Sequence, residues 1–286
     1  MNLLSIRVTI SYGAKPHVLH DLHLDVRPCE IMGLVGHSGC GKSSLALAIL
    51  GLARLKGAAV SGSILWNGRE LLNLRESEWR NLRGREIAYV PQSPASSLNP
   101  ALRIGTQLAE AWKLHAPRSG AGKQECRDAI TRALRDVTLP DTEEFLRRYP
   151  SEISVGQAQR VLIAMAILHR PPLLIADEPT SALDTITQAE ILALFGELNK
   201  RLGMSILFIS HDLASVYKLC HRIALVDAGA VVECDVPEMI FTKPSHPFTQ
   251  KLLAALPAMP EAVAREPEFE AAPTTEPRTR LRPVSQ

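Results

Sequence analysis

The chain has 286 residues, 46% of them hydrophobic, and its 32 Lys and Arg residues exceed its 30 Asp and Glu residues by 2. This length and composition suffice for a substantial buried core, in one large domain or two small ones. The nearly balanced charge argues against nucleic acid or an anionic lipid surface as a partner. No stretch approaches the roughly 18 uninterrupted apolar residues of a membrane-spanning helix, and the first residues alternate like a strand, unlike a signal peptide. We expect a globular protein that is cytosolic or peripheral to a membrane.

The cysteines are odd in number and scattered along the chain: Cys29, Cys40, Cys126, Cys220 and Cys234. None of them forms a Cys-x-x-Cys pair. This pattern argues against both a disulfide framework and a zinc site, so we expect reduced thiols.

The first two elements in chain order are predicted strands, at residues 3 to 10 and 18 to 26. Residues 22, 24 and 26 of the second strand are apolar and alternate with polar neighbours, which is typical of a half-buried strand. Residues 11 to 16 are predicted to form the turn between them, and Tyr12 lies in that turn.

A glycine-rich segment follows the apolar run 31 to 35 and precedes the helical pattern 45 to 52. It consists of Gly36, His37, Ser38, Gly39, Cys40, Gly41, Lys42, Ser43 and Ser44. The spacing fits G-x-x-x-x-G-K-[ST], in which backbone N–H groups wrap a polyphosphate and the lysine and helix dipole help to neutralise it. The Ser43 hydroxyl then lies where it can bind Mg²⁺. A turn that only joins a strand to a helix would not need the Lys-Ser pair, so we predict nucleotide binding.

The next segment predicts an antiparallel layer beside the phosphate-binding sheet. Asn67-Gly68 within residues 62 to 71 is a hairpin signal, and a short helix is expected at about 76 to 83. Residues 87 to 90 form a strand that stops at Pro91. Gln92 then begins a loop rich in Ser, Pro and Asn that runs to Pro100.

Residues 104 to about 148 change to a helical pattern. Apolar residues recur at helical spacing, first around Leu108 and Trp112 and then around Ile130 and Leu134. This predicts a helical subdomain at about residues 100 to 160, inserted in an α/β domain. A long helix then runs to about His169, and Ser154 precedes it as an ordinary N-cap that could also bind an anion.

Two apolar strands in the last third of the chain end in polar residues. The strand 173 to 176 is followed by Asp177 and Glu178, and the strand 205 to 210 is followed by His211. Paired acids at a strand end beside a phosphate loop are where Mg²⁺ and an attacking water belong. Without that loop the acids would be surface residues, and a lone histidine at a strand end is more often structural than catalytic.

The end of the predicted domain is a hairpin, in which residues 222 to 226 and 230 to 233 pair across 227 to 229. Beyond about Met259 the composition changes to Pro, Glu, Arg, Ala and Thr, with almost no large apolar residues. Such a segment cannot bury enough surface to offset its ordering entropy. We therefore predict a domain over 1 to 258 and a disordered tail over 259 to 286.

The order of these features over about residues 1 to 255 resembles the ATP-binding subunit of ABC transporters: phosphate loop, strand-end Gln, Ser-x-Gly-Gln before a helix, strand with Asp-Glu, Ser-Ala-Leu-Asp, strand-end His. Within that family the chain is most similar to the dipeptide, oligopeptide and nickel importers. The similarity to this subfamily lies in residues 91 to 94 (Pro-Gln-Ser-Pro), 97 to 100 (Ser-Leu-Asn-Pro), 149 to 150 (Tyr-Pro) and 245 to 249 (Ser-His-Pro-Phe-Thr). The resemblance implies a P-loop NTPase fold with a mixed or parallel sheet core, an antiparallel β subdomain and a helical subdomain.

The resemblance assigns nucleotide contacts to several residues. Tyr12 would stack on adenine, an interaction that for bases in general is worth about 1–3 kcal/mol. Lys42 and the amides of 39 to 44 would hold the β- and γ-phosphates of ATP.

The resemblance also assigns the metal and the chemistry. Ser43 and Gln92 would coordinate Mg²⁺, and Asp177 would hold the metal's waters. Glu178 would be the general base that orients the attacking water, and His211 would contact the γ-phosphate.

In the family, the signature acts on ATP bound to the opposite subunit, and Ser154, Gly156 and Gln157 match it. Asp184 would communicate across the dimer. The signature normally reads Leu-Ser-Gly-Gly-Gln, and here Val155 replaces its first glycine, with a β-branched side chain where backbone freedom is expected. We expect the site that this signature completes to be slow.

One cassette cannot make a complete site, so the resemblance implies a second ABC ATPase subunit. A heterodimer is preferred over a homodimer. The expected partners also include two membrane permease subunits and, indirectly, a solute-binding protein, with the chain peripheral on the cytoplasmic face of the cell membrane. Many relatives carry a cysteine cluster after the His-Pro-Phe-Thr segment; this chain has none, so no metal centre is expected there.

Three other functions are weaker matches to the sequence. Soluble ABC proteins that act on DNA or ribosomes usually have two cassettes or a long coiled-coil insertion, and neither is present. An exporter subunit is a further alternative. A simple P-loop kinase would not need the signature segment or His211.

Overall fold

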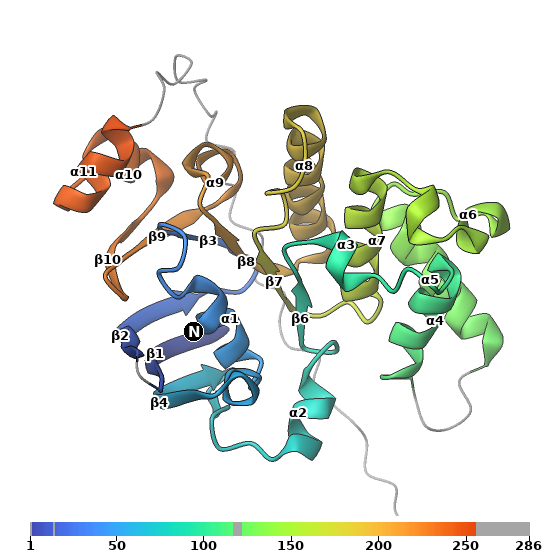
Figure 1. Cartoon of the computed structure of the whole chain (residues 1–286), viewed down its shortest axis with the longest axis horizontal. Coiled ribbons are helices and arrows are strands. Elements are labelled where there is room, and N and C mark those ends of the chain that lie inside the picture. Colours follow the sequence, from blue (N-terminus) through green and yellow to red (C-terminus); the bar gives the residue numbers. More distant parts are fainter. Residues whose placement is uncertain (1, 14, 117–121, 256–286) are drawn as a thin grey trace, which may run out of the picture.

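The computed structural model describes residues 2–13, 15–116 and 122–255. Two sheets form its centre, and helices cover them (Figure 1). The predicted tail at 259 to 286 lies outside the described residues.

The larger sheet has six strands in the order β10-β9-β3-β8-β7-β6. The strands are β3 (Ile31–Val35), β6 (Ile87–Val90), β7 (Leu173–Asp177), β8 (Ser205–Ser210), β9 (Arg222–Asp227) and β10 (Ala230–Asp235). All neighbours are parallel except β9 and β10, which form the predicted closing hairpin. Because parallel strands end at the same edge, the segments after β3, β7 and β8 lie close together.

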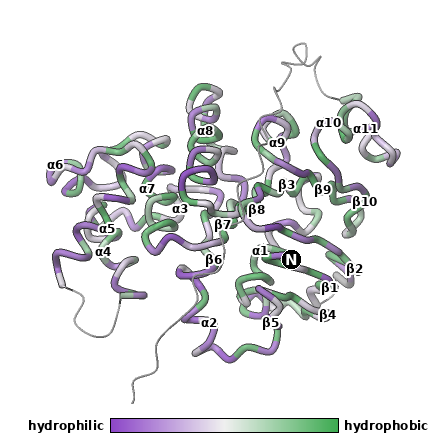
Figure 2. The backbone as a smooth tube through the Cα atoms, turned by 180° about the vertical axis from the view of Figure 1, so that it is seen from behind, coloured by the Kyte–Doolittle hydropathy of each residue, from purple (hydrophilic) through white to green (hydrophobic). Residues whose placement is uncertain are grey.

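The alternation of side chains along these strands builds two cores, one on each face of the sheet. Ile206 and Phe208 of β8 pack on one face with the helical part of the chain. Leu207 and Ile209 pack on the other with α1 and the smaller sheet. Figure 2 shows hydrophobic residues along the central strands of both sheets.

The smaller sheet is antiparallel, in the order β2-β1-β4-β5. Its strands are β1 (Leu4–Tyr12), β2 (Lys15–Val26), β4 (Ala58–Trp66) and β5 (Arg69–Glu70). Asn67 and Gly68 both have positive φ, 48° and 79°, as the tight hairpin turn requires. The prediction that Tyr12 lies in a turn is wrong, because Tyr12 is the last residue of β1 and pairs with Ala58.

The helices divide into those that cover the sheets and those that form the helical part. The first group contains α1 (Lys42–Ile49), α2 (Glu76–Leu82), α8 (Thr185–Leu202), α9 (Leu213–Leu219), α10 (Pro237–Thr242), α11 (Pro247–Ala254) and a 3-10 turn at Ala53–Lys56. The second contains α3 (Pro94–Ser97), α4 (Ile104–Lys113), α5 (Lys123–Asp136), α6 (Glu143–Arg147), α7 (Val155–Ile167) and a 3-10 turn at Pro150–Glu152. Figure 1 shows α4, α5 and α6 at one end of the molecule, beyond α7. The segment after Gln92, predicted as a loop, contains the short helix α3.

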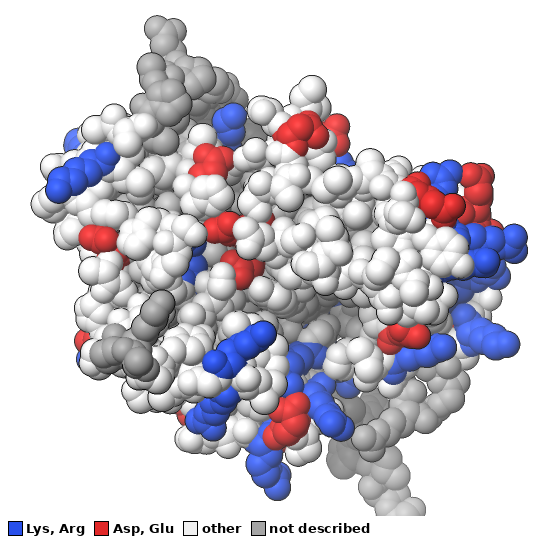
Figure 3. Space-filling view, in the orientation of Figure 1, with Lys and Arg blue, Asp and Glu red and all other residues white. Residues whose placement is uncertain are grey.

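Charged side chains of both signs occur on the face shown in Figure 3, with Lys and Arg gathered around α2 and near α5 and α6. Among the ion pairs at α2 are those of Arg83 with Glu76 and of Arg69 with Glu78. Within the described residues, no helix is long and apolar enough to cross a membrane.

Candidate functional site: a nucleotide cradle at the sheet edge

The glycine-rich segment joins β3 to α1 and surrounds the ammonium group of Lys42. Lys42 is the first residue of α1 and is 5% exposed. Its Nζ donates to the carbonyl oxygens of Gly36 and His37, at 2.8 and 3.0 Å. Gly41 has φ 101°, and a Cβ there would lie 2.6 Å from Leu19 Cδ2, so only glycine fits this position. The loop therefore presents a buried cation at a helix N-terminus, which is an arrangement suited to a phosphate chain.

Tyr12 lies beside the end of this loop, although it comes from the smaller sheet. Its Oη donates to Ser44 Oγ over 3.2 Å. The ring is partly buried. The predicted base-stacking residue is thus adjacent to the phosphate loop.

Asp177 is the last residue of β7 and connects the loop to the neighbouring strand. Ser43 Oγ donates to its Oδ1 over 3.2 Å, and Tyr89 Oη donates to its Oδ2 over 3.0 Å. Burial raises the pKa of the Asp177 carboxyl above its ordinary value, against the lowering effect of these two hydrogen bonds. Burial and the Asp177 charge also raise the pKa of the Tyr89 phenol. The charged form of the Asp177 side chain is therefore unfavourable in this buried position.

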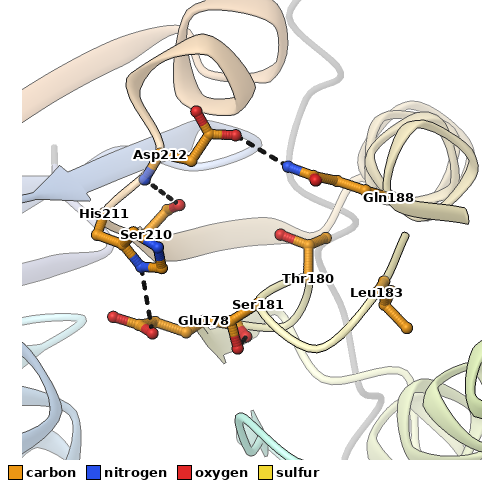
Figure 4. Close-up of a pocket in the computed structure, with 8 residues that line it drawn as sticks. All are labelled: Glu178, Thr180, Ser181, Leu183, Gln188, Ser210, His211 and Asp212. Carbon is orange, nitrogen blue, oxygen red and sulfur yellow. Dashed lines mark hydrogen bonds and ion pairs between the residues drawn. The ribbon is translucent and has the colours of Figure 1, made fainter. Parts of the chain in front are cut away.

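Glu178 follows directly and has a left-handed backbone, with φ 47°. This conformation is uncommon for a residue with a Cβ and tends to occur at functional sites. It is held because the Glu178 N–H donates to the Ile209 carbonyl over 2.9 Å. The side chain contacts two polar groups. His211 Nδ1 lies 3.3 Å from Glu178 Oε2 (Figure 4). Gln92 Nε2 donates to the same oxygen over 3.0 Å.

These contacts bring most of the predicted residues into one continuous group. From the phosphate loop it extends through Ser43 and Asp177 to Glu178, and from there to Gln92 and His211. The Ser43 hydroxyl and the Asp177 carboxylate lie within hydrogen-bond distance, and such hard oxygen donors fit Mg²⁺. The polar contacts of the Gln92 amide nitrogen are with Glu178 and Ser181.

The predicted signature residues form a second group at the start of α7. Gln157 N donates to Ser154 Oγ over 3.2 Å, and Ser154 N donates to Gln157 Oε1 over 3.1 Å, which is a capping box. A Cβ on Gly156 would lie 2.6 Å from Thr187 Cγ2, so this glycine is required by space. Val155 is the first helical residue and is 53% exposed. The backbone freedom that we expected at 155 is not needed there, because its backbone is helical.

Asp184 caps α8 next to this group. Its Oδ1 accepts from the N–H groups of Ile186 and Thr187, at 3.1 and 3.0 Å, and its Oδ2 accepts from Thr187 Oγ1 over 2.7 Å. Hydrogen bonds from Thr187 lower the pKa of the Asp184 carboxyl. Through Thr187, Asp184 contacts the signature segment, as the packing of Gly156 shows.

Sequence reasoning missed several residues of the site. Tyr89 contacts Asp177, Ser181 lies 3.3 Å from the Gln92 amide nitrogen, and Gln188 contacts Asp212. Asp212 had a readable signal, since an Asp directly before an apolar helix is a typical N-cap. Ser181 belongs to the Ser-Ala-Leu-Asp segment, but the contacts of Tyr89, Ser181 and Gln188 join distant segments and have no local signal.

The comparisons with known proteins agree with this geometry. The model of the family described as ABC transporter matches residues 19–181. The oligopeptide transport ATP-binding protein OppD of Escherichia coli is 41% identical over 260 residues, which cover 91% of this chain and 76% of that protein. The dipeptide transport ATP-binding protein DppD of Escherichia coli is 42% identical over 261 residues, covering 90% and 79%. The peptidoglycan transport ATP-binding protein YejF of Agrobacterium fabrum is 43% identical, covering 89% of this chain and 47% of that protein.

Two solved structures have the same fold. One is cbiO1 from Clostridium perfringens, part of the ABC transporter complex cbiONQ, with a TM-score of 0.73 at 25% identity, covering 85% of this chain and 91% of that one. The other is the ATP-binding cassette MJ0796, a dimer bound to ADP and Pi, with a TM-score of 0.70 at 25% identity, covering 82% and 98%. Together with the phosphate loop, the strand-end acids and the capped signature helix, these matches identify the chain as a member of the ATP-binding family of ABC transporters.

Proposed function

We propose that this chain is the ATP-hydrolysing subunit of an importer for peptides. The observation that carries the proposal is the position of Glu178, next to the phosphate loop and in contact with both Gln92 and His211. The substrate class rests on relatives named for oligopeptide, dipeptide and peptidoglycan transport. Nickel, the other substrate of the predicted subfamily, has no such support among them.

In the proposed site, the phosphate loop binds the polyphosphate of ATP. Lys42 exchanges its contacts with loop carbonyls for the β- and γ-phosphates, and the amides of residues 39 to 44 donate to the same oxygens. Tyr12 stacks on the adenine from the smaller sheet. Ser44, which accepts its hydrogen bond from Tyr12, joins these two parts.

Ser43 and Gln92 would hold Mg²⁺, and Asp177 would hold it through waters. The bound ion would neutralise charge that develops on the phosphate oxygens. The raised pKa of the Asp177 carboxyl supports this assignment, because a buried carboxylate that is costly alone gains a favourable partner when a cation arrives.

Glu178 acts as the general base in this proposal. It orients a water toward the γ-phosphate and accepts its proton, while His211 contacts the γ-phosphate and keeps the water aligned. The left-handed backbone of Glu178 aims its carboxylate toward Gln92 and His211. Positioning of this kind supplies much of the catalysis in phosphoryl transfer.

The proposed assembly pairs this chain with a second ABC ATPase subunit, preferably a different one. Ser154, Gly156 and Gln157 complete the partner's nucleotide site, and Asp184 lies at the shared face. Two permease subunits bind the pair on the cytoplasmic side of the membrane, and a solute-binding protein delivers the peptide. The dimeric state of the similar cassette MJ0796 supports the pairing.

The test is ATP hydrolysis and uptake by the transporter purified through this chain and reconstituted in lipid vesicles. We expect hydrolysis to rise when binding protein loaded with a di- or oligopeptide is added, and Lys42→Ala to abolish ATP binding at this site. Glu197→Gln on the exposed side of α8 is the control. Uptake of Ni²⁺ without peptide uptake would overturn the substrate class, and ATP binding by Lys42→Ala at wild-type affinity would overturn the site.

A further inference from the structure

The backbone around His211 is held by the residue that follows it. Asp212 Oδ1 accepts from the Ala214 N–H over 3.0 Å and so caps α9, and the Asp212 N–H donates to Ser210 Oγ over 3.0 Å. The His211 side chain is 56% exposed, and its contact within the site is with Glu178. The orientation of His211 therefore depends on how Asp212 is fixed.

The second oxygen of Asp212 is fixed from another helix. Gln188 Nε2, on α8, donates to Asp212 Oδ2 over 2.9 Å and lies 2.8 Å from Ser215 Oγ. The Ser215 hydroxyl donates to the same Asp212 oxygen. Figure 4 shows Gln188 reaching Asp212 from one side and Glu178 reaching His211 from the other. An amide donor to a carboxylate is among the stronger hydrogen bonds in proteins.

A cavity of about 250 Å³ lies between these segments. Its lining residues are Glu178, Thr180, Ser181, Leu183, Gln188, Ser210, His211 and Asp212. Side chains do not fill the space between the segment 178 to 183 and the segment 210 to 212, although the Glu178 N–H bonds to the Ile209 carbonyl where the two strands end. The bond from Gln188 to Asp212 spans from α8 to the segment that carries His211.

Gln188 is also rigidly connected to Asp184. Its backbone N–H donates to the Asp184 carbonyl over 2.8 Å, in the first turn of α8. Asp184 caps this turn with two further hydrogen bonds. A displacement of Asp184 would thus move Gln188, and through it Asp212.

We propose that Gln188 is a positioning residue, which holds His211 against Glu178 through Asp212 and transmits the position of the α8 N-terminus to the γ-phosphate site. The inference rests on the proposed function, because it assigns Gln188 a role in the same hydrolysis. Gln188 is not needed to cap α9, since the capping bond uses the other oxygen of Asp212. Its amide joins α8 to Asp212 and to Ser215 of α9, separately from that capping bond.

The first test replaces the donor with an acceptor. Gln188→Glu places a carboxylate of the same shape against Asp212, so the two repel and the bond is lost. The hydrolysis rate of the wild-type complex minus that of the Lys42→Ala complex gives the rate at this chain's own site. We expect Gln188→Glu to lower this rate about tenfold, while the dissociation constant of Mg-ATP changes less than about twofold. Gln188→Met removes the donor without adding charge and serves if the first variant does not fold.

Two matched variants separate positioning from a general disturbance. Adding Asp212→Asn to Gln188→Glu restores a donor and an acceptor in reversed order, and we expect most of the rate to return. Gln124→Glu changes another helical glutamine that donates to an aspartate, Asp128, over 2.8 Å. It lies on α5 and should leave the rate unchanged.

A double mutant with His211→Ala, measured in a single turnover, decides whether Gln188 acts through His211. If it does, Gln188→Glu adds little to the loss caused by His211→Ala. A second tenfold loss on that background, or a wild-type rate in both Gln188→Glu and Gln188→Met, overturns the inference. Absence of hydrolysis in the wild-type complex would instead overturn the proposed function.

Discussion

At the scale of single residues, the sequence motifs predicted which residues form the site and that they lie close together. They did not predict the backbone conformation of those residues. The motif around Lys42 and the two acids at the strand end predicted one group of site residues. In the structure, the contacts of Ser43, Asp177 and Glu178 connect this group. The left-handed backbone of Glu178 was not predictable, because it depends on a hydrogen bond to Ile209 of the neighbouring strand. The same holds for Tyr89, whose contact with Asp177 requires β6 and β7 to pair.

The Glu178 carboxylate gives the sharpest prediction at this scale. Glu178→Gln keeps the shape and can still accept from Gln92, but it cannot take a proton. We expect turnover to fall by about 10²–10⁴-fold, the range for general-base catalysis, with ATP binding intact. Binding of a fluorescent ATP analogue and phosphate release would measure the two effects. Loss of binding together with turnover would instead assign Glu178 to structure.

We predict that the Asp177 carboxylate lowers the stability of the folded chain but is required for hydrolysis. Burial raises the pKa of its carboxyl, so the folded chain holds the charged form at a cost. This cost is present above the raised pKa and is relieved as the pH falls through it. Asp177→Asn should therefore raise the free energy of unfolding at neutral pH, and this gain should shrink in acid. The same variant should lose Mg²⁺-dependent hydrolysis.

Urea denaturation at several pH values, without nucleotide or metal, measures the gain for Asp177→Asn. Asp25→Asn, at an exposed position of β2, is the matched control. A variant less stable than wild type at neutral pH would show that the hydrogen bonds from Ser43 and Tyr89 outweigh the burial of the charge.

At the scale of elements, periodicity predicted long elements better than short ones. The buried strands and the helices α4, α5 and α7 were expected from their apolar patterns. The helix α3 was missed because four residues are too few to show a helical period, although Pro94 at its start is a common first helical residue. Tyr12 was assigned to a turn because its pairing with Ala58 joins segments far apart in the chain.

The helix α3 links the contacts around Glu178 to the helical subdomain. Gln92 contacts Glu178, α3 begins at Pro94, and α3 packs against α7, the helix that Ser154 caps. A protein bound on α3 would therefore influence both groups of site residues. We predict that this segment receives a cytoplasmic helix of the permease.

Cysteine crosslinking tests this docking. Ser96 and Ser97 are both exposed, so a cysteine at either position should crosslink to the permease in the assembled complex. The exposed Cys29 and Cys234 are first changed to serine. Ser61→Cys, exposed on β4, is the control that should not react. Crosslinks that form only with the second ATPase subunit would place the docking surface elsewhere.

At the scale of the whole molecule, the resemblance to ABC ATPases implies that one chain holds two incomplete halves of a nucleotide site. Lys42 and Glu178 belong to the nucleotide cradle, whereas the signature segment lies at the start of α7 in the helical part (Figure 1). The polar groups of Ser154 and Gln157 bond to each other. Neither the nucleotide cradle nor the signature segment indicates which chain is the partner, because the contacts that select the partner belong to the partner's surface.

Val155 gives the prediction that belongs to this assembly. Its helical backbone accommodates valine, so any effect must come from the exposed methyl groups. At the proposed shared face these methyls reduce the room between the signature and the partner's γ-phosphate. ATP should still bind, because the partner's phosphate loop is untouched, but closure and hydrolysis at that site should be slow. The pair should therefore have one fast and one slow site.

Val155→Gly should raise ATP hydrolysis by the assembled complex and leave nucleotide affinity nearly unchanged. The glycine adds conformational freedom to the unfolded chain, so a slightly lower melting temperature is expected alongside the faster rate. Val155→Thr keeps the β-branched shape and should show no gain. Single-turnover hydrolysis would show whether the slow phase disappears in the glycine variant. A rate that stays the same or falls would mean that the shared face already accommodates valine, and the two sites would then have to be equal or differ for a reason outside this signature.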